Sequence, residues 1–153
     1  MQVDFGGDEE FDAPIGEVRS FVMNTEKVAS CIPDSNNFLR IDPNHFTMSI
    51  EPGLGVVKGS LPLHCSLESK AENNYAYSIE GKGLGSEVKM SLSLNLYEKG
   101  NSTGIKWESI INIKGIMGGI GEAVVRKITQ EYVEKIIANA RLYVHCEMIR
   151  IDS

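Results

Sequence analysis

The sequence predicts an α+β fold in which a curved antiparallel sheet of six to seven strands wraps around one long C-terminal helix. Two short helices are expected after the first strand. Between residues 38 and 113 apolar and polar residues alternate, which is the period of a half-buried strand. After residue 121 the apolar residues recur with the period of a helix. The length, 153 residues with 42% hydrophobic, predicts a single domain over residues 1–153.

The first elements follow from local signals. Residues 2–11 are predicted as a strand, and Pro14 then stands in the first turn of a helix, where its missing N–H costs nothing. Residues 13–24 carry apolar side chains at helical spacing, so this helix has one apolar face. A second short helix is predicted over residues 26–32, because Asn24 or Thr25 can cap its start and Pro33 ends it.

The strands of the sheet are predicted where every second residue is apolar. In residues 56–68 the odd positions are apolar and the even ones are mostly polar. The apolar positions of all these strands are Val57, Leu61, Leu63, Cys65 and Leu67; Phe46, Met48 and Ile50; Tyr75, Tyr77 and Ile79; Val88, Met90, Leu92, Leu94 and Leu96; Ile105, Trp107, Ile111 and Ile113. Turn-forming residues separate them at 42–44, 52–53, 72–74 and 99–101.

The long helix is predicted to begin after Gly121. Its apolar stripe is a row with a spacing of four residues, Ile120, Val124, Ile128, Tyr132, Ile136 and Ala140, widened by Val125, Val133 and Ile137. A curved sheet and a helix that each have one apolar face bury both faces when the sheet grips the helix, so we expect a helix-grip arrangement. The tail, residues 142–153, is compatible with a continued helix or with a strand.

Composition disfavours several kinds of partner and setting. The formal net charge is -6 and the 15 Lys and Arg residues are scattered, so nucleic acid is not an expected partner. The three cysteines, Cys31, Cys65 and Cys146, form no CxxC unit, which favours a reducing, cytoplasmic setting. The first residues lack the features of a signal peptide, and no apolar run reaches the roughly 20 residues of a membrane span.

Four glycines precede the long helix in KGIMGGIGEAVVRK, residues 114–127, and raise the question of a phosphate site. A P-loop requires Lys and Ser or Thr after its last glycine, whereas Glu122 and Ala123 follow Gly121 here. A dinucleotide site requires a βαβ unit, and this stretch follows antiparallel strands. The glycines are therefore expected to let the chain turn sharply into the helix.

No catalytic residue, metal site or cofactor is predicted. His64 and Cys65 are neighbours on a strand, so their side chains point to opposite faces and cannot bind one ion. His45 has no nucleophile or carboxylate partner implied by its spacing. Glu9, on the first strand, is the one titratable group that could point inward.

The inward positions suggest a cavity. Gly59, Gly81, Gly83 and Ser109 interrupt a series of large residues, which indicates a bend or an empty volume. An apolar ligand would there be held by shape, with the Tyr hydroxyl and Trp N–H orienting it. The expected lining is Phe46, Met48, Leu61, Tyr77, Met90, Trp107, Met117, Ile120, Val124 and Ile128. A fully packed core is the open alternative.

Several segments resemble the carbon monoxide dehydrogenase G-subunit family, within the START-like (SRPBCC, helix-grip) superfamily. Residues 11–35, FDAPIGEVRSFVMNTEKVASCIPDS, are similar to that family's opening block, F-x-A-P with a later C-I-P-G. Later blocks are matched by GVVKGS, YSIEGKGLG and KGIMGGIGEAVV, so the resemblance covers roughly residues 3–140. Two departures are Asp34, where the family has Gly, and Arg19, where it often has Trp.

The resemblance implies a non-enzymatic accessory protein of molybdenum hydroxylases, which assists their recruitment or maturation and holds a quinone-like or lipid-like molecule. The membrane-attaching members carry a long C-terminal extension that does not follow residue 153 here, so membrane contact is expected to be peripheral or through a partner. Two alternatives stay open. One is an enzyme of the cyclase, dehydratase or hydrolase type that uses the same cavity, and the other is an interaction module with an exposed apolar rim.

Overall fold

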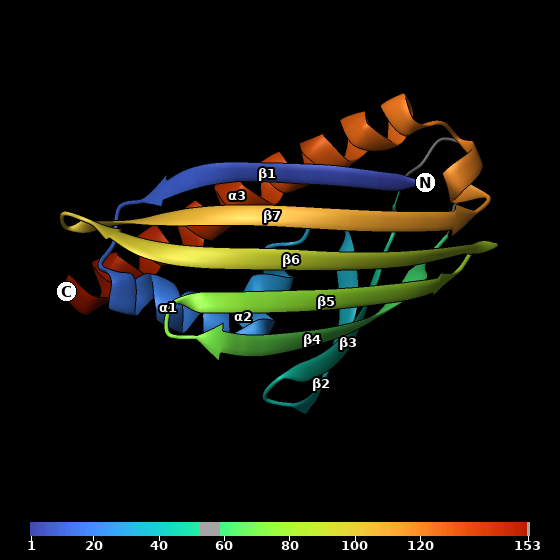
Figure 1. The fold of residues 1–153 in the computed structure, drawn as a ribbon. Coiled ribbons are helices and arrows are strands. Elements are labelled where there is room, and N and C mark those ends of the chain that lie inside the picture. Colours follow the sequence, from blue (N-terminus) through green and yellow to red (C-terminus); the bar gives the residue numbers. More distant parts are fainter. Residues whose placement is uncertain (53–58, 153) are drawn as a thin grey trace.

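A computed structural model describes residues 1–52 and 59–152, without the side chains of residues 150–152. Within these residues the chain forms seven strands and three α-helices, drawn in Figure 1. In chain order they are β1 (Gln2–Phe11), α1 (Ile15–Met23), α2 (Thr25–Ser30), β2 (Ser35–Asp42), β3 (His45–Ile50), β4 (Leu61–Ala71), β5 (Asn74–Gly83), β6 (Ser86–Lys99), β7 (Ser102–Gly115), the short 3₁₀ helix η1 (Met117–Gly119) and α3 (Glu122–Asp152). The predicted α+β helix-grip fold is confirmed.

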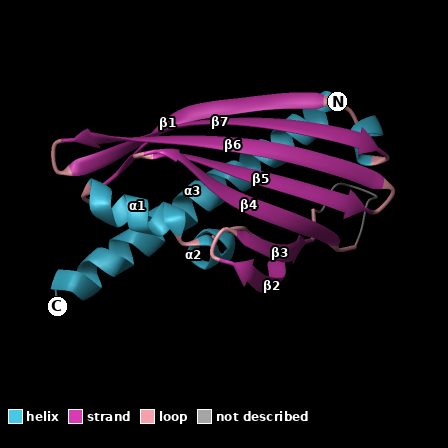
Figure 2. Cartoon of the chain, turned by 60° about the horizontal axis from the view of Figure 1, so that its bottom comes forward, coloured by secondary structure: helices cyan, strands magenta, loops and turns pink. Residues whose placement is uncertain are grey.

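The strands form one antiparallel sheet in the order β1-β7-β6-β5-β4-β3-β2. Strands β2 to β7 pair with their sequence neighbours. Strand β1 pairs with β7 and forms one edge of the sheet. The segment from β1 to β2 must therefore cross from one edge of the sheet to the other, and α1 and α2 lie on this path. Figure 2 shows α1, α2 and α3 on the same side of the sheet.

Helix α3 runs diagonally across the inner face of the sheet (Figure 1). Two arginines of α3 donate hydrogen bonds to backbone oxygens of the edge strand β1. Arg126 donates through Nη1 to the backbone oxygen of Asp4 at 3.2 Å, and Arg141 donates through Nε to that of Glu10 at 3.3 Å. Backbone oxygens at a sheet edge have no strand partner, so these bonds satisfy groups that would otherwise depend on water.

Local sequence signals set the helix and turn boundaries. The Asn24 side chain accepts from the Lys27 backbone N–H at 3.2 Å and caps α2, as predicted. Asp34 has a φ of +58°, a left-handed conformation that glycine adopts without strain. The predicted turns at 42–44, 72–74 and 99–101 are confirmed, whereas Val57 and the 52–53 turn signal beyond Pro52 lie outside the described residues.

The glycine stretch before α3 is a turn, as expected. Gly115 and Gly121 both have positive φ, at +90° and +113°. A Cβ on Gly115 would overlap the backbone oxygen of Gly85, so no other residue fits without a shift of the backbone. The turn is fixed further by the Met117 N–H, which donates to the Ser86 hydroxyl at 2.9 Å.

Helix α3 begins directly after Gly121, as predicted, and differs from the prediction in its orientation. The residues of α3 that are buried are Val125, Ala140 and Val144, whereas Val124 is 46% exposed. The predicted stripe was therefore displaced by about one residue at the start of the helix. The ambiguous tail continues the helix to Asp152. No helix in the described part of the chain combines the length and the apolar character needed to cross a membrane.

Candidate ligand-binding site

The centre of the inner face carries a row of apolar side chains that remain half-buried. We call Val88, Met90, Leu92 and Leu94 of β6 the inner row. Leu92 is flanked in the sheet by Tyr77 and Ser109, which are only 2% and 1% exposed. A side chain with residual accessibility must border space at least as large as a water molecule. The inner row therefore keeps part of its apolar surface accessible along the middle of the sheet.

Other half-buried apolar residues lie around the inner row. Phe5, Ile79 and Trp107 come from β1, β5 and β7, and Ile128 and Ile136 come from α3. Phe5 is opposite Ser109 in the sheet register, and Ile79 is opposite Met90. Six of these half-buried residues were not predicted as lining: Phe5, Ile79, Val88, Leu92, Leu94 and Ile136. Alternation had already placed Ile79, Val88, Leu92 and Leu94 on the apolar face of the sheet, and helical spacing had placed Ile136 on the apolar stripe of the long helix.

The predicted lining residues divide into three groups. Five of them are almost fully buried in the core: Phe46, Met48, Leu61, Tyr77 and Met117. Four are half-buried and can border the open space: Met90, Trp107, Ile120 and Ile128. Val124 lies at the surface, so its assignment to the inner wall is corrected, and Val125 takes the buried position. Ligand contact by any of these residues stays a prediction.

The inward glycines do not leave empty volumes. A Cβ on Gly81 would lie 2.7 Å from Cδ2 of Leu63, and one on Gly83 would lie 3.5 Å from Cδ1 of Leu61. At Gly59 the nearest atom is Cδ2 of Leu84, at 3.1 Å. Leucine side chains from neighbouring segments therefore fill the places of the predicted cavity, whereas the alternative of a bend holds at Gly59 and a turn follows Gly83.

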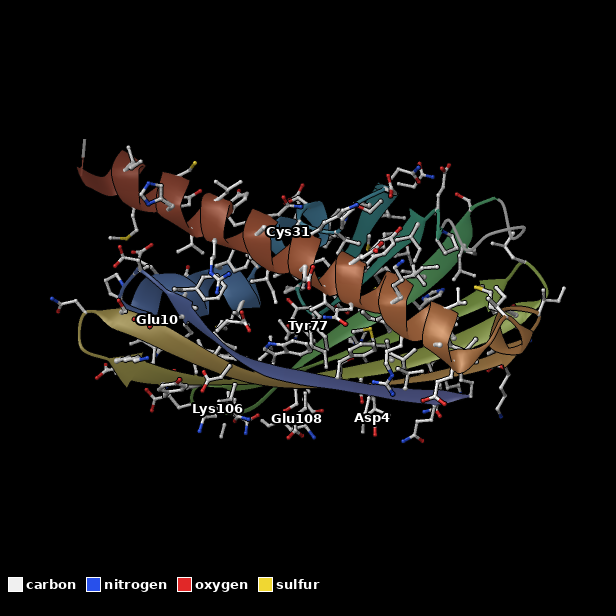
Figure 3. All side chains as sticks on the ribbon, turned by 90° about the horizontal axis from the view of Figure 1, so that it is seen from above. Asp4, Glu10, Cys31, Tyr77, Lys106 and Glu108 are labelled. Atoms are coloured by element: carbon white, nitrogen blue, oxygen red, sulfur yellow. The ribbon has the colours of Figure 1, made fainter. Side chains whose placement is uncertain are left out.

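Tyr77 uses its hydroxyl within the protein. The hydroxyl donates to the backbone oxygen of Val22 at 2.7 Å and joins β5 to the C-terminal end of α1. Burial raises the pKa of Tyr77 well above its usual value, and the nearby Cys65 adds to the rise. Figure 3 shows Tyr77 between the sheet and α3, while Asp4, Lys106 and Glu108 point to the outer side. The single hydrogen of the Tyr77 hydroxyl is therefore used within the protein, and its role in orienting a ligand stays a prediction.

Glu9 is the inward titratable group that the sequence suggested, and its side chain is 24% exposed. Its Oε1 accepts from Nη2 of Arg141 at 3.2 Å, and its Oε2 accepts from Nε1 of Trp107 at 3.5 Å. Gly7 is exposed and lies opposite Trp107 in the register, where a Cβ would approach the indole Nε1 to 2.8 Å. The indole of Trp107 therefore lies against the backbone of Gly7 on β1, which has no side chain.

Ser109 is the one inner-face residue whose hydroxyl has no hydrogen-bond partner among the described residues. It lies on β7 between Trp107 and Ile111 on the same face and is 1% exposed. Its neighbours across the strands are Phe5 and Leu92, both apolar. Neither of these two cross-strand side chains can bond to the hydroxyl.

His64 and Cys65 were considered as metal ligands because both residue types bind metals. Cys65 is buried and His64 is exposed, so they point to opposite faces as expected. Burial raises the pKa of the Cys65 thiol to about 12, so this thiol is protonated at neutral pH. Within the described residues no three His, Cys, Asp or Glu side chains come together as metal ligands.

Two open depressions of about 330 and 350 Å³ lie on the surface of the described chain. One is at the β5–β6 turn and the start of β6, around Gly85 and Lys114, and the other is beside α1 and α2, around Met23 and Arg40. Neither of these two depressions is lined by the inner row or by any predicted lining residue. They are separate features from the inner row.

Solved structures share this fold. A conserved protein from Geobacillus kaustophilus superimposes with a TM-score of 0.84 at 16% identity, over 94% of this chain and 95% of that one. A START superfamily protein from Mycobacterium smegmatis gives 0.71 at 14% identity, over 93% and 97%. The di-domain ARO/CYC StfQ of the steffimycin biosynthetic pathway gives 0.70 at 10% identity, over 97% of this chain and 52% of that one. No curated protein sequence matches the chain.

The sheet gripping a C-terminal helix is the fold that this chain shares with these structures, the START superfamily protein among them. The amino-acid sequence identifies the family of the chain. The model of the carbon monoxide dehydrogenase G-subunit (CoxG) family matches residues 7–145, and the chain belongs to that family.

Proposed function

We propose that the protein is a non-enzymatic accessory protein that binds an apolar small molecule, quinone-like or lipid-like, between α3 and the sheet. In this role it assists the recruitment or maturation of a molybdenum hydroxylase. The proposal joins two supports, the family membership of the chain and the accessible apolar surface inside the fold.

The half-buried inner row is the observation that carries the ligand part of the proposal. A packed core would bury side chains at the middle of a sheet completely, as it does for Leu61, Leu63 and Cys65 on β4. Apolar surface left accessible under a helix gains free energy when an apolar molecule covers it, at about 25 cal/mol per Å². The lining is aliphatic and aromatic, which suits a ligand held by shape.

The family supports the partner part of the proposal. Its description names a component of carbon monoxide dehydrogenase, and we infer association with an enzyme of the molybdenum hydroxylase class. We place this association in the cytoplasm, because the thiols of Cys31, Cys65 and Cys146 are all free. Contact with a membrane would be peripheral or made through the partner.

Thermal unfolding with a panel of quinones, lipids and aromatic acids tests the ligand part. A ligand present at 100 times its dissociation constant stabilises the folded state by about 2.7 kcal/mol. For a chain of this length that corresponds to a rise in melting temperature of roughly 5–10 °C. Unchanged melting temperatures across the panel would contradict the proposal.

Affinity purification from the source cell tests the partner part. The proposal expects molybdenum hydroxylase subunits to copurify with the tagged chain. Copurification of unrelated proteins alone would instead favour the interaction-module alternative, in which exposed apolar side chains dock another protein. Leu39 and Ile41 on the edge strand β2, 64% and 59% exposed, are the residues to change first in that case.

Catalysis in the same space is the second candidate function, and the position of Glu9 favours it. This carboxylate lies on the inner side of β1, in contact with Trp107, where it could exchange a proton with a bound molecule. Its other oxygen is bonded to Arg141, an arrangement that equally serves to hold α3 against β1. Turnover of a bound compound by the wild type that is lost in Glu9→Gln, with binding retained, would establish the enzyme function instead.

A further inference from the structure

We propose that the hydroxyl of Ser109 is the hydrogen-bond donor of the inner site and that it selects apolar ligands that carry a carbonyl oxygen. This inference rests on the proposed ligand-binding function and deepens it, because it assigns one polar contact to a site that is otherwise apolar.

Ser109 carries an energetic cost in the unliganded protein. Nearly all buried side-chain polar groups in folded proteins have a partner, and an unsatisfied one is strongly unfavourable. Ser109 Oγ has none in the described part of the chain, and the residue is 1% exposed. Alanine or valine would pack at this place on β7 without that cost. A hydroxyl that the empty fold does not use is explained by a partner that enters later.

Ser109 also lies beside the open space. The side chains around it are Phe5 and Leu92 across the strands and Trp107 on the same strand. All three are half-buried, so the fully buried hydroxyl lies next to side chains that keep apolar surface accessible. A change of rotamer at Leu92 or Phe5 would uncover the hydroxyl to a molecule in that space without a movement of the sheet.

The other polar groups near Ser109 are already bonded. The Tyr77 hydroxyl donates to the Val22 oxygen at 2.7 Å, and the Trp107 N–H contacts Glu9 at 3.5 Å. Ser109 therefore offers the uncommitted donor among these three groups. Since its surroundings are apolar, a ligand group that needs a single bond is favoured over one that needs several.

A carbonyl oxygen meets this requirement. It is an acceptor with no hydrogen of its own, so one bond from Ser109 satisfies it. A ligand hydroxyl or amide would bring a donor as well, and that donor would be left without a partner among the surrounding apolar side chains. Ketones, quinones and esters with an apolar body belong to the favoured class.

Two ligands of nearly equal size, 2-acetylnaphthalene and 2-ethylnaphthalene, differ in one carbonyl and test the role of Ser109. Equilibrium dialysis gives the dissociation constant of each for the wild type, Ser109→Ala and the control Ser91→Ala. Ser91 lies on β6 with its side chain exposed on the outer face. The preference for the ketone over the hydrocarbon should fall by about threefold to tenfold in Ser109→Ala and stay unchanged in Ser91→Ala.

The outcomes separate this inference from the proposed function. Equal preference in the wild type and Ser109→Ala would overturn the role of Ser109 while leaving an apolar binding site in place. Failure of both ligands to bind the wild type up to their solubility limits would overturn the inference together with the site on which it rests. The alanine variant should fold with a melting temperature at or above that of the wild type, because it loses an unpaired hydroxyl.

Discussion

Filling the space beside the inner row should cost the protein little stability. The perturbation is Leu92→Phe, at the middle of β6, compared with Leu61→Phe on β4. Both leucines lie on the inner face, but Leu61 is 2% exposed whereas Leu92 is half-buried. The larger ring of Leu92→Phe can extend into open space, whereas the ring of Leu61→Phe must displace packed neighbours such as the chain at Gly81 and Gly83.

The two variants should differ by more than the error of the measurement. Adding atoms to a packed core costs about 1–3 kcal/mol, which is the loss expected for Leu61→Phe. Substitutions that meet no packed neighbour stay within about 0.5 kcal/mol, which is the range expected for Leu92→Phe. Phenylalanine also suits a strand as well as leucine does, so backbone propensity does not favour either variant.

Urea unfolding followed by circular dichroism measures both free energies. The midpoint should fall clearly for Leu61→Phe and hardly move for Leu92→Phe. The Leu92→Phe protein should also lose the thermal stabilisation that an apolar ligand gives the wild type, because the ring occupies the ligand's space. A loss of about 1 kcal/mol or more in Leu92→Phe, comparable with the Leu61→Phe value, would show that the layer under α3 is solid and would refute the reasoning.

Three further predictions concern the elements that frame the site. Tyr77→Phe should lose about 1–3 kcal/mol in the free energy of unfolding, because the buried Val22 oxygen loses its donor. Tyr97 donates to Asp8 at the surface, so Tyr97→Phe should lose less than about 1 kcal/mol in the same urea titration. Gly115→Ala should lose at least about 2 kcal/mol, since its φ is +90° and a Cβ would meet the Gly85 oxygen, whereas Gly119→Ala, with open space at its Cβ, should change the midpoint little. The Cys65 thiol has a pKa raised from 9.0 to about 12 in the folded state, so its contribution to stability is complete below pH 9 and falls by about 1.4 kcal/mol per pH unit as the pH rises from 9 toward 12. The free energy of unfolding should therefore fall less between pH 8 and pH 10 in Cys65→Ala than in the wild type. An equal fall in the two proteins would contradict the raised pKa.

The fold could be predicted because its elements leave strong periodic signals. The alternation at Leu61, Leu63, Cys65 and Leu67 requires one buried and one exposed face, and the burial of β4 follows it residue by residue. The pairings of β2 with β3, β4 with β5, β5 with β6 and β6 with β7 follow as well, because a short turn joins the two strands of each pair, whereas the pairing of β1 with β7 has no such local signal. The turn at Leu84 was missed, since it divides a stretch whose glycines had been interpreted as bends within one strand.

The site was harder to predict because periodicity gives the face of a residue and not how closely its neighbours pack. Gly81 appeared to leave a gap, but the side chain of Leu63 reaches across from the next strand and fills it. Tyr77 was correctly placed on the inner face, but its bond to Val22 depends on where α1 crosses the sheet, which the sequence does not state. The exposure of Val124 in place of Val125 has the same origin, because a rotation of the helix by one residue leaves the apolar spacing unchanged.

The fluorescence of Trp107 gives the most direct measurement of ligand binding under α3. Trp107 is the single tryptophan of the chain and borders the open space. We predict that tetramethyl-1,4-benzoquinone, which has no free ring position for thiol addition, quenches its emission in a saturable way with a stoichiometry of one. The collisional quenching of N-acetyltryptophanamide by the same quinone sets the reference. Quenching of the protein that rises linearly, with no saturation beyond this reference, would contradict an apolar binding site between the sheet and the helix.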